Sequence, residues 1–213
     1  PPPVISAFIG EDMQQLFNAL LSHSATGAHE KQRLNTGLNF VADIGKDFSD
    51  RNRTSPFAFT GNKFEFRMVG SSATLSTPNV VLNAAVSEML SRMSDRLEKA
   101  DKSRLHEEAL GLACEFYERH KRIVFNGNGY SKEWFEEAEK RGLVHIDNSI
   151  TAYDALLAPK NVALFEKFKI MNKKELESRR AIYLDNYEKT ALIEARTMLM
   201  MAKREILPAC MEW

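Results

Sequence analysis

The sequence has few of the residues that build zinc sites, disulfide scaffolds or redox centres. Only two of its 213 residues are cysteines, Cys114 and Cys210, and neither belongs to a CxxC pattern. The five histidines form no HxH or HxxxH pair, so we interpret them as surface or helix residues. This cysteine usage favours a reducing, cytoplasmic setting.

An excess charge and a long apolar run are also missing. The 29 basic residues equal the 29 acidic ones, and the pI of about 7.4 gives no general attraction to nucleic acid or to an anionic membrane. No apolar run approaches the roughly 20 residues that span a bilayer. The first residues, PPPV, lack the features of a signal peptide. We therefore expect a soluble, non-secreted protein without a nucleic-acid or membrane partner, in which any bound anion is held locally.

The length is sufficient for one large domain or two small ones with a sizeable core. The sequence begins with three prolines and no methionine, and it stops at Trp213 just after a predicted helix. We expect a fragment of a longer protein.

Hydrophobic periodicity predicts a mainly helical α+β chain with one small antiparallel strand region. Residues 11–21 have helical spacing of apolar side chains, and residues 22–49 are polar and glycine-containing, which indicates a loop-rich insertion. Residues 57–59 and 63–68 alternate around a turn at 60–62, which predicts a hairpin.

Helices are predicted through the rest of the chain, from the Thr77-Pro78 start onward. The expected ranges are about 78–97, about 103–120, 131–142, two short segments near Thr151 and Asn161, and 172–206, the last ended by Pro208. We interpret Trp134 as a packing anchor, and the methionines at 198, 200 and 201 as helix packing residues.

The second predicted strand carries a charged row on one side and an apolar row on the other, because side chains alternate along a strand. We expect the aromatic side to be core. The charged side is either a polar cavity that holds a cation and anions, or a solvated face with cross-strand charge pairs, which is the commoner outcome for such a pattern. A carboxylate suits magnesium or manganese, and a guanidinium suits a carboxylate or phosphate. The charged row is Lys63, Glu65 and Arg67, and the apolar row is Phe64, Phe66 and Met68.

Two arginines, Arg51 and Arg53, lie among small polar residues just before the hairpin. Such a turn can present hydrogen-bond donors to phosphate, although polar turn residues also occur without a function.

Taken together, these segments resemble a known family. Residues 52–67 (NRTSPFAFTGNKFEFR) resemble, nearly letter for letter, a signature segment of type III glutamine synthetases. The resemblance continues in MVGSS at 68–72, PNVVLN at 78–83, FNGNGYS at 125–131, EKRGL at 139–143 and PPVIS at 2–6. It spans almost the whole chain.

The resemblance implies ATP-dependent ligation of ammonia to glutamate through a γ-glutamyl phosphate, with Mg²⁺ or Mn²⁺ bound. It implies that Glu65 ligates the metal facing the ATP phosphates and that Arg67 binds the carboxylate of substrate glutamate. Arg53 would be the catalytic residue that stabilises the transferred phosphate, and Lys63 would lie near the nucleotide. One departure is Ala58, where shorter members of the family carry a further arginine.

The family's other metal ligands, its flap glutamate and its N-terminal domain are not found in this sequence, so we expect the chain alone to be inactive. The resemblance places part of the catalytic domain at 1–77, including the insertion at about 22–49, and a helical C-terminal region at 78–213. It also implies a cytoplasmic enzyme of glutamine biosynthesis and nitrogen metabolism, a homo-oligomer of stacked rings. The alternative is a non-catalytic helical interaction or assembly domain.

Overall fold

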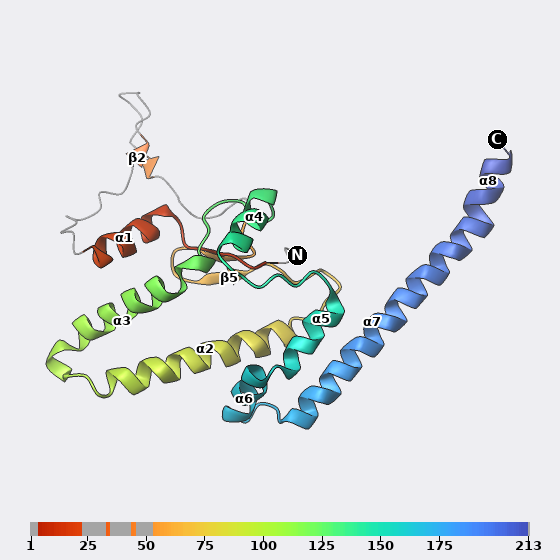
Figure 1. The fold of residues 1–213 in the computed structure, drawn as a ribbon. Helices are drawn as coiled ribbons and strands as arrows, with labels where there is room; N and C mark the ends of the chain where they lie inside the picture. The colour runs from red at the N-terminus through yellow and green to blue at the C-terminus, as the bar shows by residue number, and fades with distance from the viewer. Residues whose placement is uncertain (1–3, 23–32, 35–43, 46–52, 213) are drawn as a thin grey trace. The chain divides into compact units, whose positions relative to one another are not determined.

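The computed structural model describes residues 4–22, 33–34, 44–45 and 53–212. The chain forms two compact units, residues 1–145 and 146–213 (Figure 1). Helices dominate both the described residues of the first unit and those of the second, and the strands are few and short. The mainly helical α+β class is confirmed. The domain boundary at 77/78 stays a prediction, and most of the insertion at 22–49 lies outside the described residues, apart from the antiparallel pair β2 (Arg33–Leu34) and β3 (Ile44–Gly45).

The first unit contains a three-stranded sheet in the order β1 (Ala7–Phe8), β4 (Phe57–Phe59), β5 (Phe64–Phe66). Strands β4 and β5 are antiparallel, as predicted, and β1 pairs parallel to β4, so the sheet is mixed. In the hairpin turn the Thr60 N–H donates to the Lys63 carbonyl at 2.9 Å. Gly61 in that turn has a φ of 99°, a conformation that glycine adopts without a steric penalty.

The aromatic side of this hairpin is not the core, contrary to the sequence-based prediction. The Phe57 ring packs with the rings of Phe64 and Phe66, at centroid distances of 5.0 and 6.3 Å, yet Phe64 is 48% exposed. The buried side is the other one, where Ala58 is completely covered. Alternation separates the two sides of a strand but does not say which side is covered, and a small antiparallel sheet commonly leaves one face open.

The core of the first unit surrounds Trp134, which is fully buried with Val4 and Ala138. The indole N–H donates to the Val4 carbonyl at 3.0 Å, and the Phe125 ring stacks on the indole at 4.6 Å. The indole therefore has both its apolar surface and its polar nitrogen satisfied, and its predicted role as a packing anchor is confirmed.

Four α-helices accompany the sheet, with short 3₁₀ turns at η1 (Lys102–Arg104) and η2 (Lys121–Ile123). The helices are α1 (Glu11–Leu21), α2 (Ser76–Leu97), α3 (Leu105–His120) and α4 (Lys132–Lys140). Helix α1 has the predicted bounds, and α2 begins just before the predicted Thr77 cap. The Phe17 and Tyr117 rings stack between α1 and α3 at 4.5 Å, and Arg96 pairs with Glu115 between α2 and α3 at 2.5 Å.

Helix α4 begins and ends where its sequence predicts. The Ser131 hydroxyl accepts from the Trp134 N–H at 3.4 Å. At the other end Gly142 has a φ of 65°, its N–H donates to the Glu139 carbonyl, and the Leu143 N–H donates to the Ala138 carbonyl. These two bonds are the Schellman arrangement that ends many helices at glycine.

The second unit is helical throughout its described residues. It consists of α5 (Ser149–Asp154), η3 (Ala155–Leu157), α6 (Pro159–Lys167), α7 (Lys173–Met201), a π-helical turn η4 (Ala202–Ile206) and α8 (Leu207–Glu212). The start of α7 is the predicted capping box between Asn172 and Glu175. Its first half packs inward through the fully buried Leu176 and the Arg180–Asp154 pair.

Pro208 does not end this helix, so that prediction was wrong. Proline lacks an N–H and its ring clashes with the carbonyl four residues earlier in a continuous α-helix. The π turn at 202–206 changes the hydrogen-bond pattern just before the proline. Pro208 thus falls in the first turn of α8, where a missing N–H costs little.

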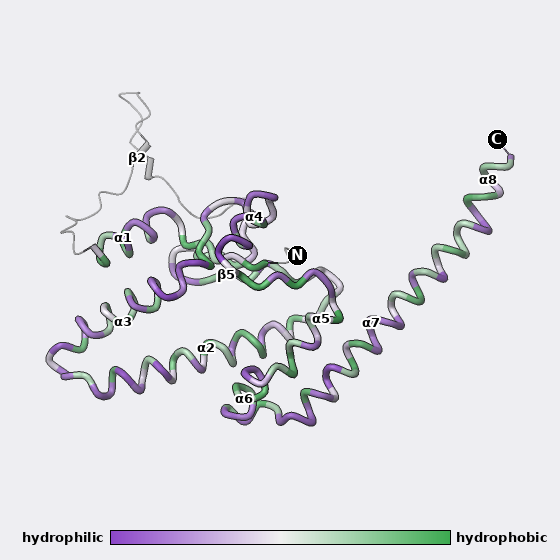
Figure 2. Tube along the Cα trace, in the orientation of Figure 1, coloured by the Kyte–Doolittle hydropathy of each residue, from purple (hydrophilic) through white to green (hydrophobic). Residues whose placement is uncertain are grey.

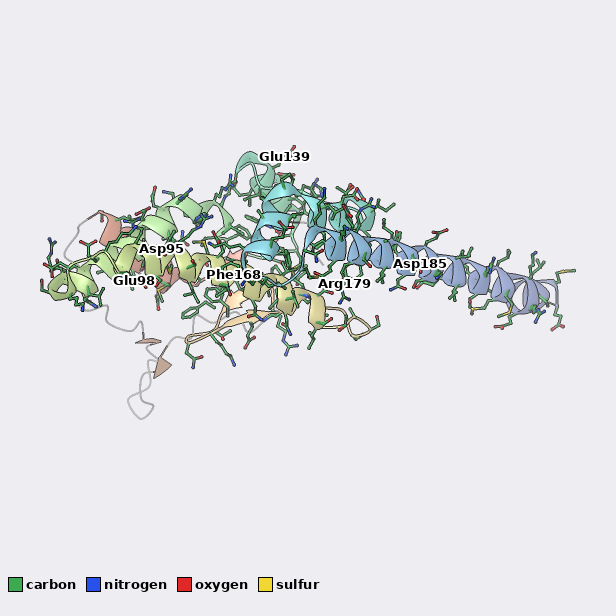
Figure 3. All side chains as sticks on the ribbon, turned by 90° about the horizontal axis from the view of Figure 1, so that it is seen from below. Asp95, Glu98, Glu139, Phe168, Arg179 and Asp185 are labelled. Atoms are coloured by element: carbon green, nitrogen blue, oxygen red, sulfur yellow. The ribbon has the colours of Figure 1, made fainter. Side chains whose placement is uncertain are left out.

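The second half of α7 carries exposed apolar side chains. Figure 2 shows the hydrophobic stretches along this helix, and Figure 3 shows side chains, among them Arg179 and Asp185, standing out on several sides of it. Ile193 is 64% exposed and Met198 69%. Met198, Met200 and Met201, which we interpreted as packing residues, are exposed within the described chain, so that interpretation stays a prediction. Among the described helices none is long and apolar enough to cross a membrane.

Candidate functional site

The charged row of β5 comes together as the strand period predicts. The Arg67 Nε and Nη2 atoms both donate to Glu65 Oε2, at 3.2 and 3.0 Å, so these two side chains share one side of the strand. Lys63 Nζ lies 3.9 Å from Glu65 Oε1. Phe64 and Phe66 lie on the other side, against Phe57. The result is a carboxylate between an ammonium and a guanidinium.

The three charges differ in their access to solvent. The side chain of Arg67 is 13% exposed, that of Glu65 40% and that of Lys63 66%. The backbone also holds Arg67, because its N–H donates to the Pro56 carbonyl at 2.8 Å and so continues the pairing beyond Phe57. A half-exposed ion pair adds at most about 1 kcal/mol to stability. The pair therefore contributes little to the free energy of folding.

The donor set of the described residues does not complete a metal site. No group of three or more histidine, cysteine, aspartate or glutamate side chains gathers in the described ranges. Glu65 offers one carboxylate, which faces two cations. Magnesium is commonly held by one or two protein carboxylates together with phosphate oxygens and water. Glu65 alone therefore does not make a metal site.

Arg53 lies on the turn that leads into β4. It is exposed, and its φ of 55° is in the left-handed region, which is uncommon for a residue with a side chain. The residue after next, Ser55, is fully buried and its hydroxyl donates to the Phe57 carbonyl at 3.1 Å. The structure thus places Lys63 and Arg67, which flank β5, beside Glu65 in its middle, and Arg53 just before the neighbouring strand.

The departure from the shorter members of the family at Ala58 has a structural counterpart. Ala58 is directly opposite Glu65 in the β4–β5 pairing and has no exposed surface. An arginine at this position would have to displace the packing that buries Ala58.

One contact of the site region was missed by the sequence analysis, which cited residues 125–131 only as part of the family resemblance. The Gly129 N–H donates to the Thr54 carbonyl at 2.8 Å. Asn126 accepts from the N–H groups of Ile9 and Gly10, at 3.2 and 3.0 Å. The repeated Asn-Gly pairs were the available signal, because such residues allow the backbone to approach other segments closely.

Comparison with known proteins places these features in a family. Residues 110–213 match the glutamine synthetase C-terminal domain. The chain is 36% identical to a type-3 glutamine synthetase of Dictyostelium discoideum over 211 residues, which is 99% of this chain and 29% of that protein.

Two bacterial relatives agree with this match. A glutamine synthetase of Butyrivibrio fibrisolvens is 34% identical over 97% of the chain, and one of Bacteroides fragilis is 33% identical over 100% of it. The chain spans 29% and 30% of the lengths of these two proteins. The chain therefore belongs to the glutamine synthetase family and carries that family's C-terminal domain at residues 110–213.

Proposed function

We propose that this chain supplies one wall of the active site of a glutamate–ammonia ligase that uses ATP. The observation that carries the proposal is the Glu65–Arg67 pair on β5, with Arg67 Nη2 3.0 Å from Glu65 Oε2, within the segment that resembles the type III signature. The low exposure of the Arg67 side chain, 13%, also supports the proposal, because a solvated strand face leaves its charged side chains open to water.

Each residue has a role in the reaction, in which ATP phosphorylates the side-chain carboxylate of glutamate and ammonia then displaces phosphate. Arg67 holds a carboxylate of substrate glutamate through its planar fork of N–H donors. Arg53 stabilises the negative charge that spreads over the phosphoryl group during transfer. Lys63, whose ammonium is largely exposed, lies near the nucleotide.

Glu65 is proposed as one ligand of a Mg²⁺ or Mn²⁺ ion whose remaining ligands lie outside this chain. When bound, such an ion neutralises phosphate charge. The task of this chain is to hold the Glu65 carboxylate in place, which the β4–β5 pairing does by fixing Glu65 opposite Ala58.

The test is made in the full-length enzyme. Arg67→Ala should chiefly raise the KM for glutamate, because a carboxylate clamp acts in the ground and transition states alike. Arg53→Ala should chiefly lower kcat, because its charge matters most as the phosphoryl group moves. Arg104→Ala removes an arginine from an exposed pair with Glu107 and should change neither constant. If both site variants altered only the KM for ATP, the assignment would be wrong.

A second candidate function is helical assembly, and the exposed apolar side chains in the second half of α7 favour it. In the full-length cytoplasmic enzyme we propose a homo-oligomer of stacked rings, to which this helix would contribute. Sedimentation velocity of the chain measures its self-association directly, and a monomer at all concentrations would count against this role.

A further inference from the structure

The loop at residues 126–129 lies in backbone contact with the turn that carries Arg53. The Gly129 N–H donates to the Thr54 carbonyl at 2.8 Å, and Thr54 directly follows Arg53. Because the backbones of Gly129 and Thr54 lie so close together, there is no space for a side chain at position 129. A Cβ there would lie 2.6 Å from Ser6 Oγ, 3.2 Å from Pro56 Cδ and 3.3 Å from the Thr54 carbonyl oxygen.

The loop itself is fixed at both of its ends. At its start Asn126 accepts from the Gly10 N–H at 3.0 Å and donates to the Gln14 side chain at 2.6 Å, which ties the loop to the start of α1. At its end the Ser131 hydroxyl caps α4 by accepting from the Trp134 N–H, and Trp134 is fully buried. A loop anchored in this way can hold another segment in place.

Ser6 shows how closely this contact is packed. It is fully buried, and within the described residues its hydroxyl oxygen has no hydrogen-bond partner. An unpaired buried hydroxyl is unfavourable, so the packing around it must compensate. Ser6 and Pro56, the residue just before β4, thus both lie close to the Gly129 backbone.

Arg53 needs such support, because its left-handed backbone is unfavourable for a residue with a Cβ and persists only where the surroundings impose it. The carbonyl of the next residue is fixed by Gly129, and the hydroxyl of Ser55 is fixed on the Phe57 carbonyl. We propose that Gly129 is a positioning residue for Arg53: it holds the turn so that the guanidinium can face the transferred phosphate. This inference rests on the role proposed above for Arg53.

The experiment is Gly129→Ala in the full-length enzyme. The added methyl group must displace the Ser6 hydroxyl and press on Pro56 and the Thr54 carbonyl, so kcat should fall by about tenfold to a hundredfold while the KM for glutamate stays within about twofold. Gly111→Ala is the matched control, because a Cβ at 111 has no atom within 4 Å, and it should leave kcat unchanged.

Two double variants separate positioning from a general structural effect. Ser6→Ala removes the atom closest to the new methyl group and should restore part of the kcat lost in Gly129→Ala. The double variant Arg53→Ala/Gly129→Ala should have the same kcat as Arg53→Ala alone, because Gly129 affects kcat only through the position of Arg53. Additive losses would overturn the inference.

The remaining outcomes are also decisive. If Arg53→Ala lowers kcat and a folded Gly129→Ala leaves kcat unchanged, the positioning role is wrong and the proposed function stands. If Arg53→Ala does not lower kcat, the role of Arg53 is wrong, and the inference that rests on it is wrong too. If Gly129→Ala does not fold, the Ser6→Ala/Gly129→Ala variant replaces it, and a kcat equal to that of Ser6→Ala alone would overturn the inference.

Discussion

Two described residues other than glycine have a left-handed backbone, Arg53 with a φ of 55° and Lys169 with a φ of 53°. Lys169 follows α6 in the arrangement that Gly142 makes after α4. Its N–H donates to the Glu166 carbonyl at 3.0 Å, and the Ile170 N–H donates to the Phe165 carbonyl at 2.9 Å. One helix end therefore uses glycine, and the other imposes the same conformation on a lysine.

Lys169→Gly should stabilise the chain by about 0.5–1 kcal/mol. Relief of the left-handed conformation stabilises the folded state by about 1–2 kcal/mol. The greater conformational freedom of glycine stabilises the unfolded chain and offsets part of this gain. Urea unfolding followed by circular dichroism measures the difference. Lys169→Ala is the control, because it removes the ammonium and keeps the Cβ. If Lys169→Ala were equally stabilising, the cause would be the charge and not the backbone.

At the scale of elements, the sequence correctly predicted helix starts and the hairpin, because residues close together in the sequence determine them. Ser131 and Asn172 were identified as helix starts because their side chains bond the first turn, and alternation identified the β4–β5 hairpin together with the shared side of Glu65 and Arg67. What depends on contacts between distant segments was missed. Examples are the two-residue strand β1, whose parallel partner is β4, and the Gly129 contact with Thr54.

The π turn at 202–206 yields a prediction about its cause. Pro208→Ala restores an N–H and removes the ring clash, so the segment can become a regular α-helix. Amide hydrogen exchange at residues 203–210 should slow by about tenfold, which corresponds to about 1.4 kcal/mol in the local opening free energy.

Pro208→Gly is the control for this change, because it restores the N–H without the helix preference of alanine. It should slow exchange less than Pro208→Ala does. Unchanged exchange in both variants would show that something other than the proline sets the π turn.

At the scale of the whole molecule, each unit exposes apolar surface that soluble proteins usually cover. In the first unit the side of the hairpin that carries Phe64 is open, and in the second unit the apolar side chains late in α7 are open. The chain spans 29% to 30% of the length of its relatives, so most of such a protein lies outside it. Surfaces of this kind are where the remaining parts or other subunits would pack.

The same incompleteness predicts that the 213-residue chain alone releases no phosphate above background when it is given ATP, glutamate, ammonia and magnesium. Glu65 provides one carboxylate, and the described residues contain no cluster that could complete a metal site. Loss of the metal removes several kcal/mol of transition-state stabilisation, and each 1.4 kcal/mol or so lowers the rate about tenfold. A phosphate-release assay with the full-length enzyme as the positive control measures this, and calorimetry should detect only weak metal or nucleotide binding. Robust glutamine formation by the chain alone would mean that its residues form a complete active site, and the proposal of a shared one would be wrong.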